Sequence, residues 1–138
     1  MAQVSSNTED FRVGIVNVHA FACPYQSKKN AQQIASIFLP FNLDVIAVEE
    51  AMDDESWELL CRNLSLTHTK FGASHGTSYG NAIASRHPIV DSFTQTSKIR
   101  ADGGARSMLQ CKFGGNHGFV QSRRFAVTHL DHLNEDDR

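Results

Sequence analysis

Val45-Ile-Ala-Val-Glu-Glu50 is an apolar run that ends in two carboxylates, and it has counterparts in Val13-Gly-Ile-Val-Asn17 and Phe125-Ala-Val-Thr-His129. Each run has the apolar character of a buried strand and ends in a polar residue. Open α/β sheets bind ligands outside the ends of their strands. An amide, a carboxylate and an imidazole at such ends are the groups that a metal-assisted phosphate site needs, so we predict such a site here.

The segment between the first two runs has the pattern of a helix. Apolar residues recur at i, i+3, i+4 and i+7, namely at Ala31, Ile34, Ala35 and Phe38. This spacing predicts a helix over residues 27–39 that Pro40 ends. A strand, a helix and a strand in this order predict a crossover with parallel strands. Asn17 should then lie close to Glu49 and Glu50.

The two neighbouring carboxylates allow more than one interpretation. Alternation along a strand sends successive side chains to opposite faces, so we expect only one of Glu49 and Glu50 to point into a given pocket. Spacing alone also leaves open that both carboxylates only mark a solvated strand end before the acidic turn that follows.

Further helix and strand signals follow Glu50. Asp53 or Asp54 is a suitable N-cap for a second helix. Its apolar face would consist of Trp57, Leu60, Cys61 and Leu64. Short strands separated by Gly- or Pro-bearing turns are predicted over residues 69–71, 81–85, 89–94, 106–113 and 119–128.

The composition is that of an ordinary globular domain. The chain has 138 residues, of which 41% are hydrophobic and 20% charged, which predicts one domain. With 13 Lys and Arg against 15 Asp and Glu, the formal net charge of −2 offers no broad basic surface for nucleic acid, although a local patch stays open. No apolar run is long enough to cross a membrane, and residues 1–10 lack the apolar core of a signal peptide. We therefore expect a cytoplasmic protein.

Five segments, in this order, resemble the endonuclease/exonuclease/phosphatase superfamily. They are Ile15-Val-Asn-Val18, Asp44-Val-Ile-Ala-Val-Glu-Glu50, Gly80-Asn-Ala-Ile-Ala-Ser-Arg-His-Pro-Ile89, Arg106-Ser-Met-Leu109 and Val127-Thr-His-Leu-Asp-His132. The resemblance implies an α/β fold that forms the N-terminal half of a four-layer DNase I-like sandwich, a mixed sheet with helices on one face. Residues 1–10 would be a disordered polar N-terminus, and residues 11–138 a partial domain truncated before the C-terminal catalytic motifs.

The resemblance also implies roles for single residues. Glu50 aligns with the ligand of a divalent metal, Mg²⁺ or Mn²⁺, while Glu49 stands where the superfamily usually has Gln. Asn17 matches the residue that steadies metal-bound water or phosphate, and His129 matches the histidine that contacts the scissile phosphate. Asn81, Arg86, Asp131 and His132 also fall in superfamily motifs, as candidates for binding phosphate or substrate.

The departures from the superfamily pattern are as informative. This sequence contains neither the Gly-Asp-Phe-Asn-like segment nor the final Ser-Asp-His-like segment whose Asp, Asn and His groups activate water. We therefore expect a metal-dependent hydrolase of phosphate mono- or diesters that is nearly inactive as this chain alone. The alternative is a non-catalytic interaction module or a vestigial truncation product. The substrate class stays open among sugar phosphates, lipid headgroups, nucleotides and nucleic acids.

An incomplete sandwich has a consequence for assembly. A missing second sheet would leave apolar residues such as Ile15, Val45, Leu109 and Val127 uncovered. Large exposed apolar patches mark interfaces or aggregation sites, so we expect self-association or a second chain on that face.

Two other enzyme classes fit poorly. His129-Leu-Asp-His132 resembles part of the metallo-β-lactamase zinc motif, but Val127 stands where that motif has a further histidine. A serine nucleophile has no Gly-x-Ser-x-Gly elbow in this sequence.

Overall fold

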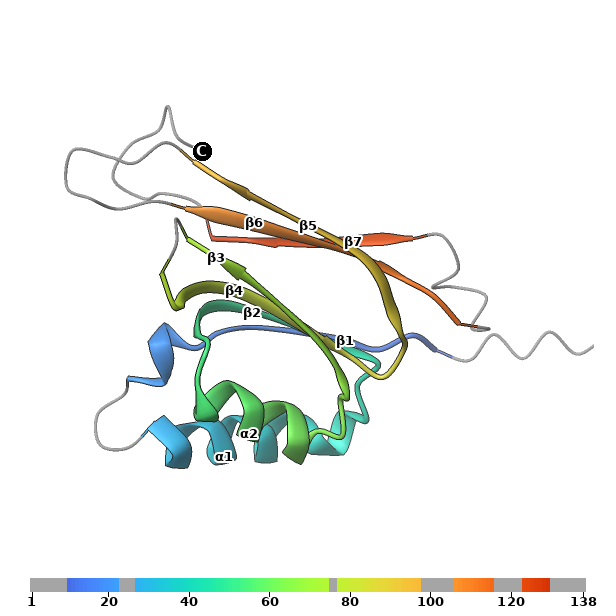
Figure 1. Cartoon of the computed structure of the whole chain (residues 1–138). Coiled ribbons are helices and arrows are strands. Elements are labelled where there is room, and N and C mark those ends of the chain that lie inside the picture. The colour runs from blue at the N-terminus through green and yellow to red at the C-terminus, as the bar shows by residue number, and fades with distance from the viewer. Residues whose placement is uncertain (1–9, 23–26, 75–76, 98–105, 116–122, 130–138) are drawn as a thin grey trace, which may run out of the picture.

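The structure, a computed structural model of the chain, describes residues 10–22, 27–74, 77–97, 106–115 and 123–129. These residues form three layers (Figure 1): a pair of helices, a four-stranded sheet and a three-stranded sheet. The helices lie on one face of the four-stranded sheet, and the three-stranded sheet covers its other face. The predicted α/β class, with a mixed sheet and helices on one face, is confirmed.

The first part of the chain builds the four-stranded sheet and its helices. Strand β1 (Val13–Asn17) is followed by the 3₁₀ helix η1 (His19–Phe21), helix α1 (Ser27–Phe38) and the 3₁₀ helix η2 (Leu39–Phe41). Strand β2 (Val45–Met52), helix α2 (Glu55–Asn63), strand β3 (His68–Ala73) and strand β4 (Tyr79–Ser85) come next. The strand order is β1-β2-β4-β3.

The local signals in the sequence account for these elements. β1 and β2 pair in parallel, with Asn17 opposite Glu49, as the crossover predicts. Helix α1 ends at Phe38, and Pro40 lies in η2, where the chain turns away. Asp54 is the N-cap of α2, because its carboxylate accepts the Ser56 N–H at 2.8 Å.

The later strands make the second sheet. Strands β5 (Ile89–Thr96), β6 (Ser107–Phe113) and β7 (Arg124–Thr128) pair antiparallel in the order β5-β6-β7. The strand predicted over residues 119–128 is thus seen from Arg124 onward, and residues 119–122 lie outside the described part of the chain.

The expectation of an uncovered sheet face is therefore largely wrong. Val45, Leu109 and Val127 are buried, because β5, β6 and β7 supply the second sheet from within this chain. Ile15 alone of the four named residues is exposed, at 67%. The reason is that β7 packs across β2 and β4, whereas β1 lies beyond it at the edge of the other sheet.

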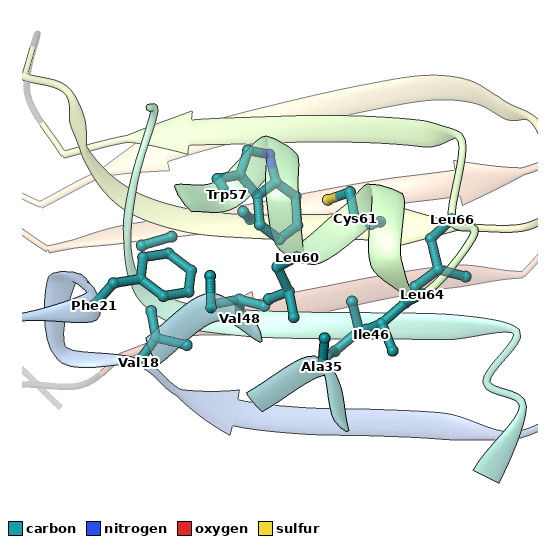
Figure 2. Close-up of a cluster of buried hydrophobic side chains, with 14 of the residues drawn as sticks. Val18, Phe21, Ala35, Ile46, Val48, Trp57, Leu60, Cys61, Leu64 and Leu66 are labelled. Atoms are coloured by element: carbon teal, nitrogen blue, oxygen red, sulfur yellow. The ribbon is translucent and has the colours of Figure 1, made fainter. Parts of the chain in front are cut away.

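Two clusters of buried side chains hold the layers together. The first, between the helices and the four-stranded sheet, includes Phe21, Ile46, Trp57 and Leu60 (Figure 2). Burying one large aliphatic side chain such as Leu60 completely is worth about 1.5–3 kcal/mol. The second cluster lies between the sheets and contains Val45, Ile83, Leu109, Cys111, Phe113 and Val127.

Some expectations fall where the structure gives no description. Residues 1–9, Asp131 and His132 all lie outside the described ranges. In the part of the chain that is described, no helix has the length and apolar character needed to cross a membrane.

Candidate functional site

Three strand ends bring the predicted polar residues together. Asn17 ends β1, Glu49 and Glu50 lie in β2, and His129 directly follows β7. β1 and β2 are parallel and in register at Asn17 and Glu49, so their polar residues share one edge of the four-stranded sheet. Because β7 packs across β2, the residue after β7 reaches the same edge from the other sheet.

Both β2 carboxylates contact the His129 ring. Glu49 Oε2 lies 3.1 Å from His129 Nδ1, and Glu50 Oε1 lies 3.1 Å from His129 Nε2. The expectation that the two carboxylates point to opposite faces is wrong. A β-bulge shifts the register between Val48 and Ala51, and Glu50 has a left-handed backbone with φ of 53°. Such a bulge breaks the alternation of side chains, so both carboxylates turn toward the imidazole.

Asn17 connects the strand end to the loop that follows. Its Oδ1 accepts the His19 N–H at 2.9 Å, and its Nδ2 lies 3.4 Å from His129 Nδ1. The side chain also hydrogen-bonds the Glu50 carboxylate. The amide therefore joins the imidazole, the carboxylate and the loop in one network.

His19 belongs to the site, and the sequence did not single it out. His19 Nδ1 lies 3.0 Å from Glu50 Oε2. The side chain is presented by η1, in which His19, Ala20 and Phe21 all have positive φ, at 46°, 55° and 55°. Histidine tolerates this conformation better than alanine or phenylalanine, for which it costs roughly 1–3 kcal/mol each. Phe21 is fully buried, which anchors the turn against the core.

A lone histidine in a short loop carries no periodic signal, so the sequence alone does not mark His19. The sequence offers one weaker indication: His19 lies two residues after Asn17, in a segment that has no glycine.

Tyr79 is a second residue that sequence reasoning missed. Burial opposes ionisation of Glu50, but hydrogen bonds from His19, Asn17 and Tyr79, together with the charge of His129, hold its pKa below the ordinary value. Burial, the Glu50 charge and the Glu50 hydrogen bond raise the pKa of Tyr79 to about 12. Glu50 is thus a carboxylate at neutral pH, and Tyr79 is a protonated donor beside it.

Asn81 lines the same small cavity as Glu50 and His129, and it connects the two sheets by hydrogen bonds. It is buried, and its Nδ2 donates to the Ser107 carbonyl at 2.6 Å and to Ser107 Oγ at 3.1 Å. A cavity of about 10 Å³, enough for about one water molecule, lies beside it. The cavity is lined by Glu50, Ser74, Tyr79, Gly80, Asn81, Arg106, Ser107 and His129. A phosphate contact from Asn81 stays a prediction.

Arg86 is not brought to this cluster. It follows Ser85, which pairs with Val45 at the start of β2, whereas Glu50 lies near the other end of that strand. Its Nη2 donates to Asn42 Oδ1 at 2.7 Å.

The donor set suits a hard cation held mainly by oxygen and water. Within the described ranges, no three His, Cys, Asp or Glu side chains already surround one point as a metal site. A cation such as Mg²⁺ does not need such a cage, because it is usually bound through one or two carboxylates and retains several waters. The ionised Glu50 beside the Asn17 amide fits this requirement.

The two described cysteines, Cys61 and Cys111, are free and buried. Burial raises the pKa of the Cys61 thiol to about 12 and that of the Cys111 thiol to about 11. Neither thiol is ionised at neutral pH, and the thiolate is the reactive form.

A sequence comparison finds that the Endonuclease/Exonuclease/phosphatase family matches residues 16–136. A search of curated proteins gives no significant match.

Solved structures share the fold. An endonuclease/exonuclease/phosphatase from Beutenbergia cavernae superposes with a TM-score of 0.66 at 21% identity, over 87% of this chain and 38% of that one. The mannosyl-6-phosphatase of Bacteroides thetaiotaomicron gives 0.69 at 16% identity, over 93% and 54%. TDP2 from Caenorhabditis elegans gives 0.64 at 16% identity, over 91% and 36%. At such identities the likeness concerns the fold alone, and the chain spans only between 36% and 54% of these proteins.

Proposed function

Because the chain belongs to the Endonuclease/Exonuclease/phosphatase family, we propose that it serves metal-dependent hydrolysis of phosphate mono- or diesters. One observation carries the proposal: Asn17, Glu49, Glu50 and His129, from three separate strand ends, form a single hydrogen-bonded cluster. Clusters of convergent polar groups at strand ends of α/β folds are where ligands bind.

Each residue has a proposed task. Glu50, with the Asn17 amide beside it, would hold Mg²⁺ or Mn²⁺, which supplies Lewis-acid polarisation of a phosphoryl oxygen when bound. Tyr79 and Asn17 keep the Glu50 carboxylate ionised and oriented. His129, whose Nε2 lies against Glu50 in this structure, would turn this nitrogen to the phosphate and stabilise the charge that develops on it. Glu49 holds the His129 ring through Nδ1, as carboxylates do for histidines in many metal sites.

We further propose that the chain by itself turns over little substrate. The described cluster provides groups that bind and orient, and the sequence lacks the Asp, Asn and His segments that activate water in the family pattern. A single positioned acid or base is worth about 10²–10⁴-fold in rate, so loss of several leaves little activity. The net charge of −2 favours a small or lipid phosphate ester over duplex DNA.

A turnover assay tests this proposal. With Mg²⁺ or Mn²⁺ and generic phosphomonoester and phosphodiester substrates, the chain should stay at background. Addition of a separately expressed C-terminal half from a family member should restore hydrolysis, and His129→Ala should abolish the restored activity. Robust turnover by the chain alone would contradict the incomplete site. Failure of every complementing half, together with no metal binding, would favour the non-catalytic alternative.

The open edge of the four-stranded sheet supports a proposal about assembly. Val13 and Ile15 on β1 are 41% and 67% exposed, beside an apolar groove of about 390 Å³ that Phe38, Phe41 and Leu43 help to line. We propose that the chain self-associates through this edge. Sedimentation velocity should show dimers that Ile15→Lys converts to monomers. A monomeric wild-type chain at high concentration would contradict it.

A further inference from the structure

The Glu50 carboxylate has an imidazole on each of its two oxygens. His129 Nε2 lies 3.1 Å from Oε1, and His19 Nδ1 lies 3.0 Å from Oε2. The two histidines differ in their surroundings, because His129 Nδ1 is held by Glu49, whereas the His19 side chain is 83% exposed. His19 therefore stands on the solvent side of Glu50, where a hydrated cation would arrive.

The separation of the His19 and Glu50 donor atoms matches a shared ligand position. Two donors at adjacent corners of an octahedron, each about 2.1 Å from the metal, lie about 3.0 Å apart. The distance between His19 Nδ1 and Glu50 Oε2 is 3.0 Å. A cation could thus bind both atoms without a change of their separation.

The backbone gives an independent reason to assign His19 a function. Glu50, Ala20 and Phe21 all adopt the left-handed conformation, although none of them is glycine or asparagine. Unfavourable backbone conformations of this kind persist where the surroundings enforce them and gather at ligand sites. Here they occur on both sides of the His19–Glu50 contact and bring its two side chains together. A hydrogen bond to an exposed histidine would not by itself require them.

We propose that His19 is a second protein ligand of the Glu50 metal and gives this site a preference for Mn²⁺ over Mg²⁺. Imidazole nitrogen is a poor ligand for Mg²⁺, whereas Mn²⁺, although it too favours oxygen ligands, accepts one imidazole more readily. The inference rests on the proposed function, because it requires a cation at Glu50. Glu50 and His19 would bind the cation directly, with the Asn17 amide beside them and water at the remaining positions.

Pulsed electron paramagnetic resonance of Mn²⁺ bound to the chain tests the assignment directly. Wild type should show modulation from a directly bound ¹⁴N nucleus, and labelling with ¹⁵N-histidine should change it. His19→Asn should remove this signal and lower the ratio of Mn²⁺ to Mg²⁺ affinity severalfold. Asparagine tolerates left-handed backbone, so the turn is preserved. His68→Asn, in a strand residue that pairs with Ser85 at the other end of the sheet, is the matched control and should change neither reading.

The outcomes are separable. Nitrogen modulation that survives His129→Asn but not His19→Asn supports the proposal. Modulation lost only in His129→Asn overturns it, because His129 would then be the nitrogen ligand. Mn²⁺ binding that Glu50→Gln abolishes, without any histidine nitrogen, overturns the role of His19 and leaves the proposed function standing. No Mn²⁺ binding by wild type overturns both.

Discussion

The two ends of strand β2 each place a carboxylate beside a histidine, but the two pairs are built differently. At the start, His87 Nε2 lies 3.0 Å from Asp44 Oδ1, and Asp44 Oδ2 accepts the Arg12 N–H at 2.9 Å. Both side chains are largely buried, and the left-handed residue nearby is Asn42, a type that tolerates this conformation. At the other end, a bulge and several unfavourable backbone angles gather four polar side chains around His129 and Glu50.

The difference separates a structural pair from a candidate site. The two Asp44 oxygens contact Arg12, just before β1, and His87, in the turn after β4. These contacts connect the start of β2 to both segments. Glu50 is instead surrounded by groups that also contact one another, through Asn17 and His129. Titratable groups with shifted pKa values that converge in this way mark functional sites more often than isolated ion pairs do.

The largest contrast between the two ends should appear in stability. Asp44→Asn leaves one oxygen for two donors, so we expect the free energy of unfolding to fall by about 2 kcal/mol. Glu50→Gln also loses an acceptor oxygen, but its partner His19 is 83% exposed and can turn to water instead, so we expect a loss of about 1 kcal/mol or less. Urea denaturation of the two variants measures both values. Equal losses would mean that the Glu50 end is as structural as the Asp44 end.

The pKa of Tyr79 depends in part on the charge of Glu50. The pKa of Tyr79 is raised to about 12, by burial first and by Glu50 second. In a Tyr25→Phe background, where Tyr79 is the remaining tyrosine, Glu50→Gln should lower this pKa by part of the shift, because the burial remains. Asp44→Asn should leave it unchanged. Ultraviolet difference titration after rapid pH jumps provides the measurement, and an unchanged pKa in Glu50→Gln would contradict the contact.

The pH dependence of stability gives the sign of the Glu50 interaction. Because its folded pKa lies below the ordinary value of 4.5, Glu50 contributes stability above that pH and loses it as the pH falls through the lowered pKa. The difference in unfolding free energy between wild type and Glu50→Gln should therefore shrink as the pH falls from 4.5 through the lowered pKa. A difference that grows over this acidic range would contradict this direction.

The smallest effect concerns the turn that carries His19. Ala20→Gly should raise the free energy of unfolding by about 0.5 kcal/mol, because relief of the positive φ slightly exceeds the entropy that glycine adds to the unfolded chain. Ala31→Gly in α1, where the backbone is helical and the methyl group is buried, is the contrasting variant and should lower it by about 1 kcal/mol or more. Thermal unfolding of both variants tests the pair. A destabilised Ala20→Gly would show that the turn is not strained.

Local sequence signals predicted much of the fold. Apolar periodicity placed α1 and α2, and the order of elements predicted the parallel pairing of β1 with β2. These signals depend on residues that are close in the sequence or on a single strand–helix–strand unit, so they can be recognised from the sequence alone. The second sheet was not expected in this chain, because the pairing of β5, β6 and β7 across their connections leaves no periodic trace.

The candidate site was predicted in part for the same reason. Strand ends identified Asn17, Glu50 and His129, which the structure brings together. The bulge that turns Glu49 into the cluster depends on a positive φ at Glu50. Glutamate rarely adopts this conformation, so the residue type does not predict it. His19 and Tyr79 arrive through a turn and a neighbouring strand, so only the tertiary structure reveals them.

Binding of Mn²⁺ followed residue by residue tests the central claim most directly. Titration of Mn²⁺ into the ¹⁵N-labelled chain should broaden amide signals around Asn17, His19, Glu50 and His129. Signals around Asp44 and Arg86 should remain sharp, and Glu50→Gln should abolish the broadening. Broadening centred on the Asp44 end, or none at all, would contradict the assignment of a metal-assisted phosphate site to the carboxyl end of β2.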